Sequence, residues 1–332
     1  MSQHREDVYG STLGGHREVV SGPIAVEPMQ SQMFVDAVVA GGGDVQPLSE
    51  QTKGLVWLSE KRADELAEIL QAHPQIEWVQ LPWAGVDAFS ELLSDLASRD
   101  QSSRPVVTSA KGAYSEPVAE HALTLMQACL RQIPQKARSG VWQEARTGLS
   151  LFGRHVVIVG AGGISHALID LLAPFRVNIS VVRRDASVAV SGANQTVGPD
   201  ALRELLPTAD VVVLAAASTR GTARIIGEAE FAALPQHSVL VNIARGALVD
   251  TDALVHALDS GEIASAGLDV TDPEPLPDGH PLFSRHQCVI TSHSADTPEM
   301  TAPLLASRIS HNVAAFVTGG SLRGVVSPEL GY

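Results

Sequence analysis

The segment HVVIVGAGGIS at residues 155–165 decides the fold, because an apolar stretch runs directly into a glycine-rich turn. The β-branched run 155–159 predicts a buried strand, and the apolar spacing in 165–175 predicts a helix after the turn. Glycines at such a turn let the backbone bend sharply and approach a pyrophosphate, which the helix N-terminus attracts. We therefore expect a dinucleotide-binding unit that begins near residue 155. Its expected cofactor contacts in the turn are Gly160, Gly162, Gly163 and Ile164.

The turn departs from the usual GxGxxG pattern at its last position, where Ser165 replaces glycine. The third glycine normally allows close packing of the helix against the strand, so its loss puts tight cofactor packing in question, although serine is small enough to fit. A glycine-rich turn can also be purely structural. The strand before it, and the helix and second strand after it, favour cofactor binding.

The second strand of the unit, NISVV at 178–182, ends in two arginines, Arg183 and Arg184. NAD-binding units usually carry an acid about 20 residues past the first glycine, where it binds the ribose 2′-hydroxyl. Here the first acid, Asp185, comes after both arginines. Two guanidinium groups suit a 2′-phosphate through their charge and their forked donors. We therefore favour NADP(H), while NAD(H) stays possible if both arginines are ordinary solvated charges of the loop.

Apolar runs and helical patterns alternate along most of the chain, which predicts an α/β fold with parallel sheets. In the first part, strands are expected at IAVEPM, GLVWLS and IEWVQL, and helices at SQMFVDAVVAGG and EKRADELAEILQAH. A long helix, with Ser115 as its N-cap and Pro117 in its first turn, opens a second region. Short helices there separate six expected strands in a doubly wound pattern. These strands are HVVIV, NISVV, DVVVLAA, SVLVNIA, IASAGLDV and CVITS.

The chain of 332 residues has a formal net charge of −14 and a pI of about 5.2. Such a surface repels phosphate backbones and anionic lipids, so we expect neither nucleic-acid nor membrane partners. Cys129 and Cys288 stand far apart without metal or redox spacing, which indicates buried thiols in a reducing compartment and no metal site. The first 20 residues lack the apolar core of a signal peptide, and no apolar run is long enough for a membrane helix. A cytoplasmic location is therefore expected.

Side chains with chemistry follow the later strands of the second region, where an open α/β sheet binds its ligand. Arg245 follows the fourth strand, Glu274 lies just beyond the fifth, and His293 follows the sixth. Arg245 can hold a carboxylate and polarise a ketone oxygen through its forked donors. His293 can deliver the proton that a new alkoxide needs, and Glu274 on the far ring nitrogen would favour the protonated imidazole. Each residue alone could be an ordinary loop side chain, but their joint placement indicates hydride transfer to a 2-keto acid.

These residues lie in long runs that resemble the D-isomer-specific 2-hydroxyacid dehydrogenase family, from about residue 24 to residue 332. The runs are NIARGALVDTDALVHALDSGEIASAGLDVTDPEPLP at 242–277, TSHSA at 291–295, LPWAGVD at 81–87 and EPVAEHAL at 116–123. The resemblance implies two Rossmann-like domains. A doubly wound cofactor domain at 115–297 is inserted in a smaller flavodoxin-like substrate domain at 23–114 and 298–332. Residues 1–22, which are polar and lack apolar periodicity, are expected to be a flexible extension.

The same resemblance implies roles for individual residues. Arg245, Glu274 and His293 would be the family's catalytic set, and Asp269 would meet the nicotinamide carboxamide. Backbone amides around three residues of the other domain would hold the substrate carboxylate, namely Trp83, Ala84 and Gly85. Further cofactor contacts are expected at Ala217, Thr222 and Ala244. The family forms dimers through its cofactor domain, so a homodimer is expected.

The run WVQLPWAGVD and the arginine pair look most like glyoxylate and hydroxypyruvate reductases, which implies a small 2-keto or D-2-hydroxy acid as substrate. Ala217 departs from the family by replacing a common proline, and Ser294 and Asp296 follow His293 where small residues are usual. Glu274 argues against the formate-oxidising branch, which carries glutamine there. Two alternatives stay open. One is an NAD(P)-sensing, corepressor-like interaction protein of the same fold, and the other is a dehydrogenase of the opposite stereochemistry.

Overall fold

The computed structural model describes residues 19–29, 31–142 and 144–331, so residues 1–18 of the expected extension lie outside the described residues. The described chain divides into two compact units. One unit contains the residues up to Tyr114 together with those from Pro298 onward, and the other contains Ser115–Thr297. The chain therefore leaves the first unit once and returns to it once.

The unit Ser115–Thr297 is built on one parallel sheet of seven strands in the order β11-β10-β9-β8-β5-β6-β7. This order reverses between β5 and β8, which creates the switch point where open α/β sheets bind nucleotides. The prediction of a doubly wound parallel sheet is confirmed, with one strand more than the six expected. The strands are β5 (His155–Val159), β6 (Asn178–Val182), β7 (Gln195–Val197), β8 (Val211–Leu214), β9 (Val239–Asn242), β10 (Ser265–Leu268) and β11 (Cys288–Ile290).

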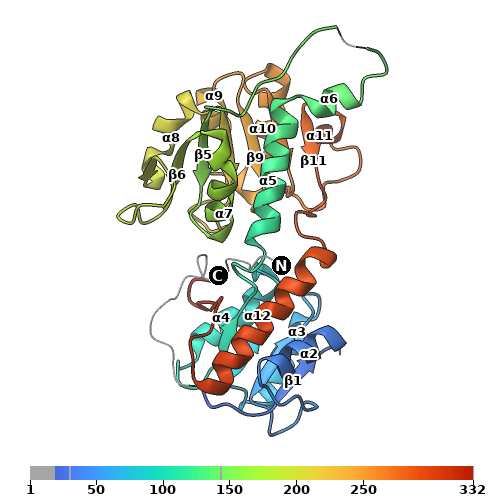
Figure 1. Cartoon of the computed structure of the whole chain (residues 1–332), viewed down its shortest axis with the longest axis vertical. Helices are drawn as coiled ribbons and strands as arrows, with labels where there is room; N and C mark the ends of the chain where they lie inside the picture. Colours follow the sequence, from blue (N-terminus) through green and yellow to red (C-terminus); the bar gives the residue numbers. More distant parts are fainter. Residues whose placement is uncertain (1–18, 30, 143, 332) are drawn as a thin grey trace. The chain divides into compact units, whose positions relative to one another are not determined.

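Helices cover both faces of this sheet, so its central strands are buried on both sides. Helix α5 packs against α7 and against β9 and β10, and Figure 1 shows α5 and α7 on the same side of the sheet. Helices α9 and α10 contact each other and contribute apolar side chains such as Phe231 and Leu254 to the core. The helices are α5 (Ser115–Leu130), α6 (Ile133–Ala137), α7 (Gly163–Leu172), α8 (Leu202–Leu205), α9 (Glu228–Ala233), α10 (Thr251–Ser260) and α11 (Pro281–Ser284).

The other unit carries a second parallel sheet, in the order β1-β2-β3-β4. A parallel bridge between Ile24 and Val45 adds a short segment beside β1, on the side away from β2. If that segment is counted as a strand, the order becomes 2-1-3-4-5, which is the order of flavodoxin-like folds. The strands are β1 (Ile24–Glu27), β2 (Gly54–Trp57), β3 (Trp78–Gln80) and β4 (Val106–Thr108).

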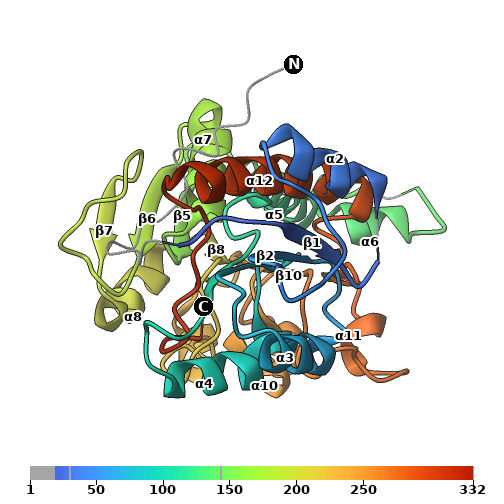
Figure 2. The same cartoon turned by 90° about the horizontal axis from the view of Figure 1, so that it is seen from below.

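Helices α2 (Gln32–Ala40) and α12 (Pro298–Thr318) cover one face of this second sheet, and α3 (Ala63–Ala72) and α4 (Ser90–Ser98) cover the other (Figure 2). Leucines of α3 and α4 pack with Trp57 in one core cluster. On the opposite face, the Phe316 ring of α12 lies 5.2 Å from the Trp78 ring, centroid to centroid. Both expected helices and all three expected strands of this part form, and β4 and α4 are additional.

Within the described residues, no helix is both long and apolar enough to cross a membrane. The same residues contain no group of histidine, cysteine and acidic side chains that could hold a metal ion.

Candidate active site

The glycine turn after β5 has the backbone shape that a bound pyrophosphate needs. Gly160 adopts a φ of 116°, and a Cβ atom added there would lie 2.5 Å from the carbonyl oxygen of Ala215. Glycine is therefore required, because the turn passes directly against the start of the loop after β8. Gly162 is the N-cap of the ten-residue helix α7, and a Cβ there would meet only open space. This combination of an open helix N-terminus and a glycine backbone fits an approaching anion.

Ser165, which raised the question of loose packing, is buried in the first turn of α7. Its hydroxyl donates a hydrogen bond of 3.0 Å to the carbonyl oxygen of Gly160. The side chain thus links the helix to the strand end instead of holding them apart. Replacing the third glycine leaves the turn closed by a side-chain bond, which accounts for the tolerance of serine at this position.

Arg183 and Arg184 follow β6, the neighbour of β5 in the sheet. Arg183 is half-buried, and its guanidinium donates to the carbonyl oxygen of Val188 at 3.2 Å. The Arg183 side chain is therefore bonded within the loop that follows β6. Burial lowers the pKa of His166 on α7, and the positive charge of Arg183 lowers it further. Arg184 is exposed.

The loop after β8 is held by a threonine. The Thr222 hydroxyl donates to the carbonyl oxygen of Ala217 at 2.8 Å and accepts from the backbone N–H of Thr219 at the same distance. Ala217 and Thr222 are therefore tied to each other at the end of the strand next to β5. Both expected cofactor contacts lie at the switch point.

Arg245 is positioned by an asparagine that the sequence reasoning did not single out. Asn242 is the last residue of β9 and is buried. Its side-chain N–H donates to the carbonyl oxygen of Arg245 at 2.9 Å. Its side-chain oxygen accepts from the Ala244 N–H. The Arg245 guanidinium donates to the Ala244 carbonyl oxygen at 2.7 Å. The turn carrying the arginine is thus fixed by both ends of one amide side chain.

Gly246 fixes the same turn by steric contact. A Cβ atom at this position would lie 1.9 Å from the backbone carbonyl of Thr271, so any side chain would push the two segments apart. Thr271 in turn donates its backbone N–H to the Glu274 carboxylate at 3.4 Å. The glycine therefore lets the segment that carries Arg245 lie directly against the segment that carries Glu274.

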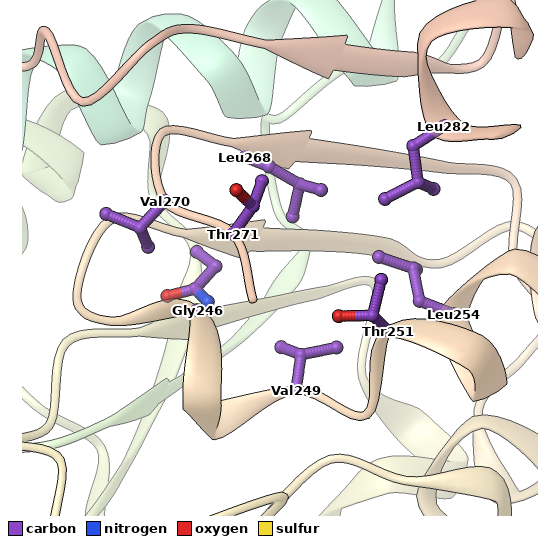
Figure 3. Close-up of a pocket in the computed structure, with 9 residues that line it drawn as sticks. Gly246, Val249, Thr251, Leu254, Leu268, Val270, Thr271 and Leu282 are labelled. Atoms are coloured by element: carbon purple, nitrogen blue, oxygen red, sulfur yellow. The ribbon is translucent and has the colours of Figure 1, made fainter. Parts of the chain in front are cut away.

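A small pocket lies beside this contact, with Gly246 and Thr271 in its wall (Figure 3). Its other walls are mostly apolar and include Val249, Leu254, Leu268 and Leu282, whose side chains converge on the same space (Figure 3). The space is enough for about one water molecule. Arg245, Glu274 and His293 do not line it. It is a packing gap beneath the Arg245 turn and not a substrate site.

Glu274 and His293 form the expected pair. His293 Nδ1 lies 2.6 Å from Glu274 Oε1, and the two side chains are 46% and 42% exposed. A carboxylate only accepts hydrogen bonds, so Nδ1 carries the proton in this contact and Nε2 is left for a ligand. Because both groups are half exposed to solvent, the pair acts on the orientation of the ring more than on the stability of the fold.

Asp269 follows β10, and its carboxylate accepts bonds from the loop that carries His293. Oδ1 accepts from the Ser294 N–H at 2.9 Å, and Oδ2 accepts from the Ala295 N–H at 3.1 Å. Burial alone would raise the pKa of Asp269, but hydrogen bonds from His121, Thr291 and these two amides outweigh burial and lower it. The carboxylate is therefore charged and bound to its own loop.

Asp296, three residues after His293, is a further acid of the site. Burial raises its pKa to about 6; the charges of His293 and Arg245 oppose the rise, and the charge of Asp269 supports it. The unfolded chain would release this proton near pH 4. Between about pH 4 and pH 6 the native state therefore binds more protons than the unfolded state, and stability falls as the pH rises through that window.

Asp296→Asn is therefore expected to remove this pH dependence. At pH 7 the variant should be more stable than the wild type by about 1 kcal/mol, a figure reduced because the carboxyl is partly solvated. Urea unfolding measured from pH 4 to pH 7 tests the expectation. Asp278→Asn, at an exposed position, is the control and should leave the wild-type slope unchanged. An unchanged slope in Asp296→Asn would show that this carboxyl does not titrate in the window.

The expected substrate-binding residues of the other unit follow β3. The loop is held by backbone bonds, since the Trp83 carbonyl oxygen accepts from the Ala110 N–H at 3.0 Å. Tyr114 donates its hydroxyl to the Pro82 carbonyl oxygen at 2.7 Å and contacts the Trp83 ring edge-on, with centroids 6.1 Å apart. Trp83, Ala84 and Gly85 are all half-buried. The loop is a defined structure at a strand end, and its carboxylate-binding role stays a prediction.

The sequence predicts the three candidate catalytic side chains at adjacent strand ends, but the residues that support them were not predicted. Asn242, Thr291 and His121 were not proposed, although all three lie inside the quoted sequence runs. A polar residue at the end of an otherwise apolar strand, or on the inner face of a helix, could have indicated them. A polar side chain in such a place requires a hydrogen bond, here to a neighbouring loop.

Comparison with known proteins matches this unit to one family. The model of the D-isomer specific 2-hydroxyacid dehydrogenase, NAD binding domain, matches residues 122–295. A glyoxylate reductase from Korarchaeum cryptofilum is 29% identical over 80% of this chain and 80% of its own length. Another from Aeropyrum pernix is 31% identical over 68% of this chain and 70% of its own length.

Among solved structures, a D-isomer specific 2-hydroxyacid dehydrogenase from Xanthobacter autotrophicus, in complex with NADPH and MES, has a TM-score of 0.77. It is 26% identical, and the match covers 94% of this chain and 100% of that chain. The family model covers more than half of the chain, and the relatives extend the likeness into the other unit. The chain therefore belongs to the D-isomer specific 2-hydroxyacid dehydrogenases, a family of oxidoreductases.

Proposed function

We propose that the chain reduces a small 2-keto acid of the glyoxylate or hydroxypyruvate type to the D-2-hydroxy acid, with NADPH as the favoured cofactor. The observation that carries this proposal is the 2.6 Å contact between His293 and Glu274, which leaves Nε2 of the ring available as an acid. The likeness to two glyoxylate reductases supports the choice of substrate class. A cofactor-sensing protein without turnover would have no need of such a proton donor.

The proposed role of each catalytic residue follows from its charge and its hydrogen-bonding groups. Arg245 binds the substrate carboxylate and polarises the ketone oxygen, since its planar fork of donors suits two oxygens. The nicotinamide supplies the hydride. His293 gives its Nε2 proton to the oxygen that becomes negative, and Glu274 accepts the Nδ1 hydrogen bond that orients the ring. In the oxidation direction, neutral His293 takes the proton back. The backbone amides near Trp83, Ala84 and Gly85 are proposed to hold the same carboxylate.

The cofactor is proposed to lie along the strand ends of the unit Ser115–Thr297. The N-terminus of α7 and the glycine turn would hold the pyrophosphate, because a helix N-terminus and exposed amides attract it. Thr222 and Ala217 would line its middle, while Ala244 and Asp269 would lie near the nicotinamide. Arg183 and Arg184 would bind a 2′-phosphate. The Xanthobacter neighbour, which was solved with NADPH, is consistent with this choice.

Removing the two arginine charges tests the cofactor preference. Arg183→Gln/Arg184→Gln is expected to weaken NADPH binding by about 1.5–3 kcal/mol, because at least one charge-assisted hydrogen bond to the phosphate is lost. NADH binding should change little. The Kd values are measured by fluorescence titration. The charge-matched control is Arg62→Gln/Arg99→Gln, which changes two arginines of the other unit that each form an ion pair with a nearby acid. If the wild type binds NADH as tightly as NADPH, the preference is wrong.

Turnover itself is tested with a panel of 2-keto acids, each offered with NADPH and with NADH. The panel should span glyoxylate, hydroxypyruvate, pyruvate and branched or aromatic keto acids, and loss of reduced-cofactor absorbance reports the rate. The highest kcat/KM is expected for glyoxylate and hydroxypyruvate. Cofactor binding without turnover of any member would support the sensing alternative instead.

A homodimer is proposed for the same chain. Trp142 is 93% exposed and Val141 beside it is 76% exposed, which is unusual for large apolar side chains of a folded unit. Both follow α6, whose Ile133 is also exposed. A second copy of the chain would cover these side chains. Sedimentation velocity shows whether the particle has twice the 35.0 kDa mass of the chain, and Trp142→Ser should weaken the association.

A further inference from the structure

His293 holds a backbone conformation that a histidine rarely adopts. Its φ is 48°, in the left-handed region where a Cβ atom is strained. Such a conformation persists only where surrounding contacts enforce it, and it is concentrated at functional sites. The His293 N–H is shared between two acceptors, the carbonyl oxygens of Asp269 at 2.8 Å and Thr291 at 2.9 Å. The backbone of the proton donor is therefore held from β10 as well as from its own loop.

Asp269 accepts most of the hydrogen bonds that fix this part of the backbone. In addition to its backbone oxygen, its carboxylate accepts from the N–H groups of Ser294 and Ala295, the two residues directly after His293. The side chain is 1% exposed, so these bonds form in a site from which water is excluded. A buried carboxylate that accepts several hydrogen bonds is fully charged and holds its donors firmly. The two residues after the strained position are thus attached to one side chain.

Thr291, at the start of the same loop, and His121, on α5, complete the arrangement. The Thr291 hydroxyl donates to Asp269 Oδ1 at 2.5 Å. Because a hydroxyl has one proton, its 2.9 Å contact with His121 Nε2 requires the histidine to donate. Nε2 of His121 is also 3.5 Å from Asp269 Oδ1. His121 lies on α5, so the chain of bonds connects a long packed helix to the loop of the proton donor.

We propose that Asp269, Thr291 and His121 form a positioning network that holds His293 in its left-handed conformation and so aims its ring at the substrate oxygen. Asp269 thereby has a role beyond the contact with the nicotinamide that the family resemblance implies. Glu274 orients the ring from the side-chain end, and this network orients it from the backbone end. The catalytic role of the network rests on the proposed function, whereas the hydrogen bonds that define the network do not depend on it.

The test uses Thr291, because its variants separate the hydroxyl from the methyl group. Thr291→Val keeps the shape and removes both hydrogen bonds, whereas Thr291→Ser keeps them. In Thr291→Val, kcat for keto-acid reduction is expected to fall on the order of 10²-fold, as for a reacting group displaced by about 1 Å, with KM and the NADPH Kd within about twofold. Thr291→Ser should restore most of the rate. Thr124→Val, which removes an exposed hydroxyl bond on α5, is the control.

His121 gives a second, independent variant. His121→Gln can still donate to Thr291 and should lose little, whereas His121→Leu should approach the loss seen in Thr291→Val. A crystal structure of Thr291→Val should show His293 relaxed from positive φ. Equal rates in Thr291→Val and the wild type, or an unchanged φ in the variant, would overturn the network. If the wild type itself reduces no keto acid, the proposed function fails, and the φ measurement still decides the network.

Discussion

Replacing His293 with alanine is expected to lower kcat by about 10²–10⁴-fold in both directions, the range that a positioned general acid or base contributes. Reduction loses the donor of the proton, and oxidation loses its acceptor. NADPH binding should change little, because the side chain is 46% exposed and contacts Glu274 instead of a residue proposed for the cofactor. Stopped-flow rates with each substrate and an NADPH titration measure the two effects separately. A variant with more than a tenth of the wild-type rate would remove His293 from the mechanism.

Glu274→Gln tests the partner of His293 through the rates of both directions. Glutamine keeps the size of the side chain, but its amide can donate as well as accept, so it no longer fixes which ring nitrogen faces it. The rates of reduction and oxidation are therefore expected to fall on the order of 10²-fold, as for a misplaced reacting group. The measurement is kcat in each direction, with the NADPH Kd as a check that the cofactor site is intact.

A matched control exists on the surface of the same unit. His256 and Glu262 form a looser pair, with 3.9 Å between Nε2 and Oε1. Glu262→Gln removes a glutamate beside a histidine without touching the strand-end loops, and its rates should equal those of the wild type. If Glu274→Gln also has the wild-type rates, Glu274 does not orient His293 and is an ordinary loop acid.

The parallel sheet of the cofactor unit could be predicted because its strands are apolar on both faces and alternate with amphipathic helices. Strand β7 was missed for a physical reason: its three residues, Gln195–Val197, are not fully buried, so no apolar run marks them. In the other unit, β4 is equally short and was missed as well. Short edge strands are fixed by their pairing with a neighbour, and the local pattern carries little of that information.

The contact between Glu274 and His293 could be predicted because parallel strands bring their carboxyl ends to one edge of the sheet. The left-handed backbone of His293 could not be anticipated, since it depends on bonds from Asp269, a residue 24 positions earlier in the chain. The same holds for Ser165, whose bond to Gly160 replaces the contact that a third glycine would have made. Such supporting contacts depend on three-dimensional geometry that residue spacing does not encode.

Arg245→Lys is expected to lower kcat/KM for 2-keto acids by about 10²–10³-fold, although the charge is kept. The loss corresponds to weakening two charge-assisted hydrogen bonds, one to the carboxylate and one to the ketone oxygen, each worth about 1.5–3 kcal/mol. A lysine places three donors on one atom and cannot reproduce the planar fork. The backbone beneath it should stay in place, because Asn242 binds the main chain at this position and not the side chain.

Separate measurement of kcat and KM shows whether the bond from Arg245 to the ketone oxygen or its bond to the carboxylate contributes more. Loss of the ketone contact, which strengthens as negative charge develops on the oxygen, should lower kcat, whereas loss of the carboxylate contact alone should raise KM. We expect both to change, because one guanidinium makes both contacts. Arg224→Lys, an exposed arginine paired with Asp250 at 3.3 Å, is the control. A kcat/KM for Arg245→Lys within tenfold of the wild type would mean that positive charge alone suffices at this position. In that case the amides around Trp83, Ala84 and Gly85 would have to orient the substrate, and Arg245 would serve only to attract it.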